Sequence, residues 1–246
     1  MRVAAPRPNP VGRRPGGRPL SQLFKFNAIG ALARKAAIAA VGLCVLFTAG
    51  FAAAQTAPRA ADFAGAPASG DARQVADWVV ATSDNRSLPF VIVDKKATEV
   101  FVFDGHGRLS GATSALLGLA RGDDSAPGVG DKKLSDIRPD ERTTPAGRFV
   151  ASLGYGLGKQ DILWVDYKTA LALHRVLASN TREHRLQRLA APSALDHRIT
   201  FGCINVPVSF YDRIVQPAFT GTSGVVYILP ETKTIADVFF RSATSS

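Results

Sequence analysis

The spacing of hydrophobic residues changes along the chain, and this change predicts where helices and strands lie. Val75, Trp78 and Val79 fall on one helical stripe within 71–81, so we predict a short helix capped by Asp71. From residue 90 onward, short runs of β-branched and aromatic residues alternate with turn residues, which is typical of strands. These runs are 90–94, 99–103, 108–112, 148–153, 161–166 and 225–229. Many short strands and few helices indicate a mainly β fold.

Three other segments depart from the strand pattern. Residues 118–144 are rich in Gly, Asp, Ser and Pro, and a loop of this length is typically functional or mobile. Its Lys132, Lys133 and Arg138 either contact an acidic polymer or form a solvated surface. Residues 183–189 are polar and basic, which also favours a solvated surface. Residues 208–215 predict a helix, because Pro207 suits its first turn.

The first 54 residues have the pattern of an export signal. Residues 1–35 contain eight Lys or Arg and no acidic residue, and an apolar run, 36–54, follows and ends in three alanines. This run is about as long as a membrane span, so an uncleaved anchor is the alternative to a cleaved signal peptide. We expect cleavage, because Ala and Gly dilute the hydrophobicity of the run.

Removing this segment changes the charge of the chain. The whole chain has a net charge of +10, but eight of its 30 basic residues lie in the segment, which leaves 22 against 20 acidic ones. The remaining net charge, about +2, gives no support to nucleic-acid binding. The mature chain is then divided into a linker and short helix (55–88), one domain (89–232) and a C-terminal tail (233–246). Within the linker, 55–70 is rich in Ala, Pro and Gly, which predicts flexibility.

Cysteine usage identifies a candidate nucleophile. Cys44 lies in the signal, so an exported chain keeps only Cys203, which has no intramolecular disulfide partner. Gly202 permits close approach of a substrate, and the Gly202 and Cys203 amides are candidate oxyanion donors. A helix starting just beyond Cys203 would lower the pKa of its thiol. Three basic residues near this site in sequence are candidates for favouring the thiolate or binding a substrate carboxylate: Arg175, Arg198 and Arg213.

Two motifs carry a resemblance to a known family. The stretch Thr200-Phe201-Gly202-Cys203-Ile204-Asn205 resembles the Ser/Thr-His-Gly-Cys-hydrophobic-Asn signature of L,D-transpeptidases, the YkuD-type catalytic domain. Residues 144–149 resemble the Thr-Pro-x-Gly-x-Phe strand entry of the same family. The resemblance spans roughly 90–230. It has one departure, since Phe201 stands where the family usually has His.

The resemblance implies a YkuD-like β-sandwich or barrel in the bacterial periplasm, acting on peptidoglycan stem peptides without a cofactor. Cys203 would attack the bond after the third residue of a stem tetrapeptide, form a thioester and pass it to an acceptor amine. His174 matches the position of the family's general base. The other implied site residues are the Gly202 oxyanion amide, a Thr200 supporting hydroxyl, and substrate contacts from Arg175, Arg198 and Asn205.

Other histidines compete for the role of base, because a cysteine nucleophile requires a positioned base. His106 lies in a Gly-flanked turn and His184 in a charged run, whereas His197 lies six residues before Cys203 and stays a candidate. For His174, we expect the backbone carbonyl just after it to orient the imidazole tautomer. The spacing of His, Cys and acidic residues does not indicate a metal site.

The same residues allow more than one function. A thioester on Cys203 can be passed to a second stem peptide or a protein amine, or it can be discharged onto water by a wall hydrolase. A catalytically weak, wall-binding scaffold is a third possibility, and Phe201 is the feature that favours it. An uncleaved segment 36–54 would anchor any of these to the inner membrane.

Overall fold

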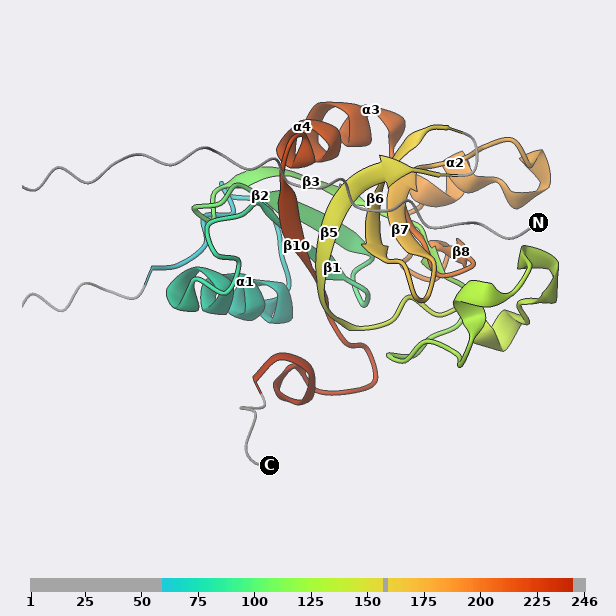
Figure 1. The fold of residues 1–246 in the computed structure, drawn as a ribbon, viewed down its shortest axis with the longest axis horizontal. Helices are drawn as coiled ribbons and strands as arrows, with labels where there is room; N and C mark the ends of the chain where they lie inside the picture. The colour runs from blue at the N-terminus through green and yellow to red at the C-terminus, as the bar shows by residue number, and fades with distance from the viewer. Residues whose placement is uncertain (1–58, 157–158, 241–246) are drawn as a thin grey trace, which may run out of the picture. The chain divides into compact units, whose positions relative to one another are not determined.

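The computed structural model describes residues 59–156 and 159–240, and it confirms the mainly β fold. Its eight-stranded sheet has the order β3-β2-β1-β10-β5-β6-β7-β9 (Figure 1). The strands are β1 (Phe90–Asp94), β2 (Glu99–Phe103), β3 (Leu109–Ser114), β5 (Gly147–Tyr155), β6 (Asp161–Asp166), β7 (Leu171–Arg175), β9 (Ile204–Val206) and β10 (Ser223–Ile228). The predicted export segment, 1–54, lies outside the described residues.

The sheet is nearly closed by the chain that follows β3. Leu116 exchanges two backbone hydrogen bonds with Asn205 of β9, at 2.8 and 2.9 Å, so the two edge strands of the sheet meet. A small parallel pair of strands, β4 (Leu117–Gly118) and β8 (Arg198–Thr200), continues this closure. The closure brings the residues before β9 next to the region that follows β3.

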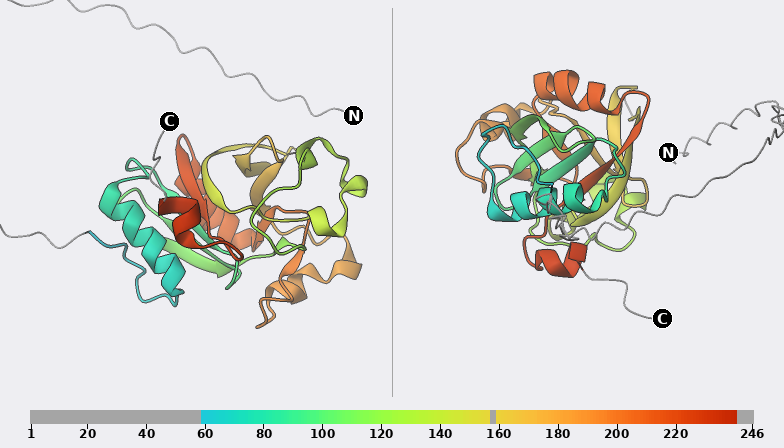
Figure 2. Two further views of the ribbon diagram at one scale, coloured as in Figure 1. Left: turned by 90° about the horizontal axis from the view of Figure 1, so that it is seen from below. Right: turned by 90° about the vertical axis from the view of Figure 1, so that its left-hand side faces the viewer.

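The sheet separates two hydrophobic cores, because the central strands are buried on both faces. In β1, Val91 and Val93 belong to one core, whereas Phe90 and Ile92 belong to the other. Helix α1 (Gly70–Thr82) covers the second core. The first core is covered by a continuous helical stretch on the opposite side of the sheet (Figures 1 and 2). This stretch comprises α3 (Val208–Phe210), the π-helical η5 (Tyr211–Val215) and α4 (Gln216–Phe219).

Helix α1 begins one residue before the predicted range, and its cap differs from the prediction. The Ser69 hydroxyl accepts a hydrogen bond from the Ala72 amide at 3.0 Å and donates one to Asp94 at 2.5 Å. Asp71 instead lies in the first turn, where a negative charge also favours the helix. The Ser69–Asp94 bond therefore ties the start of α1 to the end of β1.

The described parts of the predicted linker and tail pack on the domain. Phe63 is 4% exposed and packs edge-on against Phe101 and Phe103 of β2. In the tail, η6 (Ala236–Phe240) contacts α1, because Phe240 lies 5.3 Å from the ring of Trp78. Both segments belong to the folded unit, since they cover aromatic residues that would otherwise be exposed. Among the described residues, no helix has the length and hydropathy of a membrane span.

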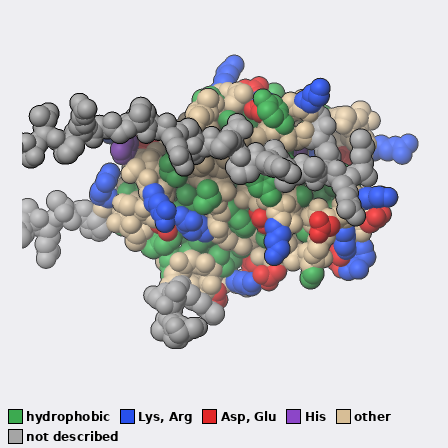
Figure 3. All heavy atoms as spheres, in the orientation of Figure 1, with side chains coloured by type: hydrophobic (Ala, Val, Ile, Leu, Met, Phe, Trp, Pro, Cys, Tyr) green, Lys and Arg blue, Asp and Glu red, His purple; other side chains and the backbone are tan. Residues whose placement is uncertain are grey.

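The long loop contains short 3-10 helices instead of being wholly irregular. They are η1 (Val129–Asp131), η2 (Leu134–Asp136) and η3 (Pro139–Glu141). Two of its three candidate basic residues have acidic partners, since Lys132 pairs with Glu141 at 2.6 Å and Arg138 with Asp140 at 2.8 Å. Figure 3 shows blue and red side chains close together on this side of the molecule. This pairing favours the solvated-surface interpretation over binding of an acidic polymer.

Lys95 fixes the base of this loop from inside the protein. Its side chain is fully buried, and its ammonium group donates to the Gly122 carbonyl, the Asp123 carboxylate and the Thr144 carbonyl at 2.5 to 2.9 Å. Burial lowers the pKa of Lys95, while the Lys95 ammonium group and neighbouring donors hold the pKa of Asp123 far below its usual value. The two ends of the loop are therefore joined at one charged centre.

Replacing Lys95 by Met leaves the Asp123 charge buried without its ammonium partner. We expect Lys95→Met to lower the free energy of unfolding by about 3–5 kcal/mol, measured by urea denaturation. Lys96→Met is the matched control, because the Lys96 side chain is 51% exposed and pairs with the exposed Asp71. Its effect should stay below about 1 kcal/mol. Equal effects of the two substitutions would contradict the importance of the buried pair.

Candidate active site

The candidate nucleophile and base lie on neighbouring parallel strands. In the β7–β9 pair, His174 is aligned with Asn205, and Cys203 immediately precedes β9. Alternate residues of a strand point to the same face, so Cys203, Asn205 and His174 share one face. Leu173 and Ile204 point the other way into the core. The parallel pairing thus brings together residues separated by 29 positions in the sequence.

His174 has a defined orientation. Its Nδ1 lies 2.8 Å from the Arg175 carbonyl, as expected for the carbonyl that follows the base, and its Nε2 lies 3.1 Å from the Asn205 side-chain amide. A carbonyl only accepts hydrogen bonds, so the proton of the neutral ring is on Nδ1 and Nε2 carries the lone pair. Burial lowers the pKa of His174, which favours this neutral form at pH 7. The histidine is therefore able to accept a proton.

Cys203 is a protonated thiol in this arrangement. Its Sγ is 3.6 Å from the Ala170 carbonyl, to which it donates a weak hydrogen bond. Burial raises the pKa of the thiol, while the Ala172 amide and the charge of Arg185 act in the opposite direction. The expected help from a helix dipole is absent, because β9 follows Cys203 and the next helix begins only at Val208. A neutral thiol needs a general base to become a nucleophile.

A tight turn holds Cys203, and its polar groups bond to one another. Gly202 has φ +128°, and a Cβ there would lie 2.9 Å from the Thr143 carbonyl, so the position requires glycine. The Gly202 amide donates to the Thr200 hydroxyl at 3.2 Å, and this hydroxyl donates to the Cys203 carbonyl at 2.7 Å. Thr200 thus supports the backbone of the turn, not the thiol. Because the Gly202 amide already has an acceptor, the Cys203 amide is the better placed oxyanion donor.

Phe201 has a different role from the histidine of the family signature. Its ring lies 4.1 Å from the guanidinium carbon of Arg142, a cation–π contact. Arg142 also donates to the Ile137 carbonyl at 3.1 and 3.2 Å, and the Thr144 hydroxyl donates to the Gly202 carbonyl at 2.7 Å. Phe201 therefore packs the end of the long loop, at Arg142, against the turn that holds Cys203.

Two arginines predicted to contact substrate have protein partners. Arg175 pairs with Asp161 at 3.0 Å and Asp212 at 2.6 Å. The Arg198 side chain is only 9% exposed, pairs with Glu231 at 2.6 Å and donates to the Lys95 carbonyl. These partners occupy both guanidinium groups. The two arginines therefore hold strands and loops together, and neither is placed to bind a substrate carboxylate. Asn205, also a predicted substrate contact, is buried and contacts His174 instead.

His197 is buried away from solvent, with partners at both ring nitrogens. Nδ1 lies 2.6 Å from the Thr98 hydroxyl and Nε2 lies 3.0 Å from the Ala191 carbonyl. The residue is 3% exposed. A histidine fixed in this way joins the segment before β8 to the turn after β1, which makes His197 a structural group in our interpretation.

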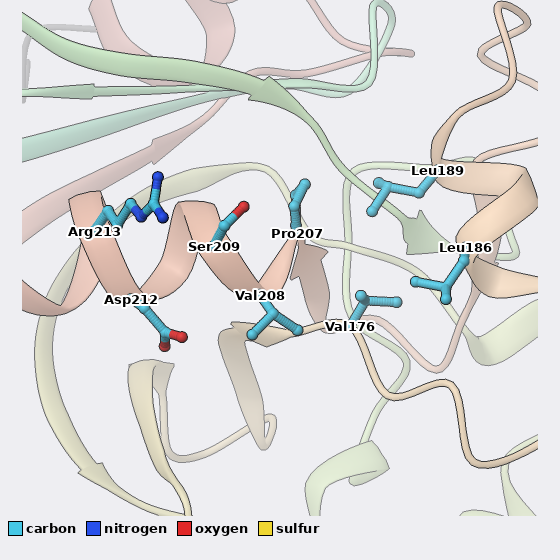
Figure 4. A pocket seen from close by; sticks show the side chains of 8 residues that line it. All are labelled: Val176, Leu186, Leu189, Pro207, Val208, Ser209, Asp212 and Arg213. Atoms are coloured by element: carbon cyan, nitrogen blue, oxygen red, sulfur yellow. The ribbon is translucent and has the colours of Figure 1, made fainter.

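A groove opens beside the shared face of β7 and β9. Val176 and Pro207 follow the two strands at alternate positions from His174 and Asn205, so the strand pattern continues this face into the groove. The groove has a volume of about 490 Å³. Figure 4 shows Leu186 and Leu189 pointing into it from α2 (Arg185–Leu189). Val208, Ser209, Asp212 and Arg213 complete its lining. A chain with apolar and charged groups fits such a lining.

The structure also places an arginine in the site that the sequence analysis did not single out. Arg185, the first residue of α2, donates to the Asn205 side-chain oxygen at 2.8 Å. The segment 183–189 predicts a solvated charged face, and none of its residues is fully buried. Arg185 is the charged side chain of this segment that turns toward the site, and no local pattern signals it.

Comparison with known proteins finds similarity only to solved structures, since no protein-family model and no curated protein sequence matches the chain. The helical cell shape determining protein Pgp2 from Campylobacter jejuni is 15% identical, with a TM-score of 0.40, covering 60% of this chain and 49% of that one. The L,D-transpeptidase (residues 123–326) from Xylanimonas cellulosilytica is 14% identical, with a TM-score of 0.36, covering 62% and 68%. The catalytic domain of the E. faecium L,D-transpeptidase is 16% identical, with a TM-score of 0.30, covering 58% and 98%. The match thus spans about half the length of Pgp2.

Proposed function

We propose that this protein is an L,D-transpeptidase that acts on peptidoglycan stem tetrapeptides outside the cytoplasm. The observation that carries the proposal is the placement of Cys203 and His174 on one face of neighbouring strands, with the Nδ1 proton of His174 held by the Arg175 carbonyl. The signature around Cys203 and the Thr-Pro-x-Gly-x-Phe segment at 144–149 support the same family.

The first half of the reaction forms a thioester. His174 Nε2 takes the proton of the Cys203 thiol, and the thiolate attacks the carbonyl of the third stem residue. The Cys203 amide stabilises the resulting oxyanion. The C–N bond then breaks, the terminal residue leaves as an amine carrying the proton from His174, and the acyl group stays on sulfur.

The second half transfers the acyl group. An acceptor amine attacks the thioester carbonyl and gives its proton to His174, after which the C–S bond breaks and the sulfur regains that proton. The acceptor is a second stem peptide or a protein amine. If water attacks the thioester in place of the amine, the protein is a hydrolase. If no thioester forms, the protein only binds the wall and serves as a scaffold.

Product analysis distinguishes these functions. Purified protein is incubated with disaccharide-tetrapeptides, and the products are identified by mass spectrometry. We expect cross-linked dimers together with the released terminal amino acid. Tripeptide monomers without dimers would replace transfer by hydrolysis, whereas unchanged substrate with retained wall binding would refute enzymatic activity. The Cys203→Ala variant is the control for both products, because it lacks the acyl-accepting sulfur.

A further inference from the structure

Arg185 reaches the candidate active site from the segment between β7 and β8. Its Nη1 donates to Asn205 Oδ1 at 2.8 Å, and its Nε pairs with the carboxylate of Glu183. The Arg185 side chain is 12% exposed, so its position is fixed by these two partners.

One directed series of hydrogen bonds runs from Arg185 to His174. An arginine only donates, so the Asn205 oxygen faces Arg185 and the Asn205 NH₂ group faces His174. The Nε2 atom of His174 must then be an acceptor, which leaves the ring proton on Nδ1 for the Arg175 carbonyl. Without Arg185 the amide of Asn205 can turn by half a rotation and present its oxygen to the ring.

A turned Asn205 amide would favour the positively charged imidazolium form of His174. An imidazolium ring donates from both nitrogens, so it would find acceptors in the Arg175 carbonyl and the turned Asn205 oxygen. In the native orientation the NH₂ group opposes a proton on Nε2. The hydrogen bond from the Asn205 NH₂ group and the positive charge of Arg185 therefore both favour the neutral form of His174 and lower its pKa.

We propose that Arg185 is a positioning residue that, through Asn205, keeps the ring of His174 neutral with its proton on Nδ1 and its lone pair on Nε2. The catalytic consequence rests on the proposed function, whereas the effect on the imidazole is a property of the folded chain alone. The Asn205 amide contacts Nε2 of the ring, and Arg185 contacts that amide. Burial lowers the pKa of His174, and the charge of Arg185 acts in the same direction. The guanidinium of Arg175 is turned away toward Asp161 and Asp212.

The test uses the imidazole itself as the probe. We expect NMR titration to show a higher His174 pKa in Arg185→Met than in the wild type, with loss of the predominant Nδ1–H tautomer. Arg185→Lys keeps the charge and a donor, so it should stay close to the wild type. Arg182→Met removes an equal charge from an exposed position of the same segment and should change nothing. An unchanged titration in folded Arg185→Met would overturn the proposal.

Kinetics separate positioning from a structural role. If His174 is the base, acyl-enzyme formation from disaccharide-tetrapeptides by Arg185→Met should be slow at about pH 6 and recover toward about pH 9, where even a raised pKa leaves the ring neutral. An equal loss at every pH would refute the positioning role. A wild type that forms no acyl-enzyme would refute the proposed function instead, and the titration would still decide the inference about Arg185.

Discussion

Cys203→Ala is expected to abolish formation of the acyl-enzyme and to lower cross-linking by at least about 10⁴-fold, since removing a catalytic nucleophile leaves only binding and oxyanion effects. No other cysteine in the described residues can replace it. The measurement is intact-protein mass spectrometry after incubation with disaccharide-tetrapeptide, with the adduct located by peptide mapping. The family resemblance also implies a carbapenem adduct on Cys203, which supplies a second probe of the same sulfur.

The control for this prediction is the fold of the variant. Cys203 is only partly buried and makes one weak hydrogen bond, so alanine should leave the thermal unfolding temperature nearly unchanged. Loss of the adduct in a folded variant then reports on chemistry. Any covalent turnover that survives in Cys203→Ala would rule out the nucleophile assignment.

The strands were predictable because their signals are local. The runs at Phe90–Asp94, Glu99–Phe103 and Asp161–Asp166 have the predicted bounds. Consecutive positions are buried in the first two, whereas buried and half-buried positions alternate from Leu163 onward in the third. The packing of the predicted linker was missed because it depends on one residue. Phe63 enters a distant aromatic cluster, and nothing in the Ala-, Pro- and Gly-rich segment around it signals that contact.

The active site was predictable only to the extent that its motifs are continuous in sequence. The signature pointed to Cys203, and the upstream position of the family's base, at the end of a strand, pointed to His174. Arg185 was missed because its role arises from the register of β7 with β9, which exposes the Asn205 oxygen to the segment between β7 and β8. The expected helix dipole at Cys203 was wrong for a related reason. Three residues of strand, Ile204–Val206, pair with β7 before the helix can begin.

The burial of His197 could not be predicted from the sequence either, because its hydrogen-bond partners come from turns that are distant along the chain. Thr98 precedes β2 and Ala191 follows α2, and no local pattern links either of them to position 197. Distance in the sequence favoured His197 as base, since it lies six residues before Cys203. The hydrogen bonds favour His174, whose Nε2 faces the same side of the sheet as the thiol.

Paired substitutions of the two histidines should therefore give opposite results. We expect His174→Ala to slow acylation of Cys203 by about 10²–10⁴-fold in the folded protein, the usual contribution of a positioned base. We expect His197→Ala to leave the acylation rate of the folded protein within a few-fold of the wild type. It should instead lower the free energy of unfolding by about 1–3 kcal/mol, because the partners of a buried imidazole are left unsatisfied.

The decisive measurement is the single-turnover acylation rate as a function of pH, recorded for both variants below their unfolding temperatures. The wild type should lose activity as the pH falls and His174 becomes protonated, and burial places this loss below the pH at which an ordinary histidine titrates. His197→Ala should keep that acid limb, whereas His174→Ala should lack it, because no base then titrates beside the thiol. If His174→Ala instead acylates at a near-normal rate while His197→Ala does not, the base is His197, and the face shared by β7 and β9 would not be the site of proton transfer.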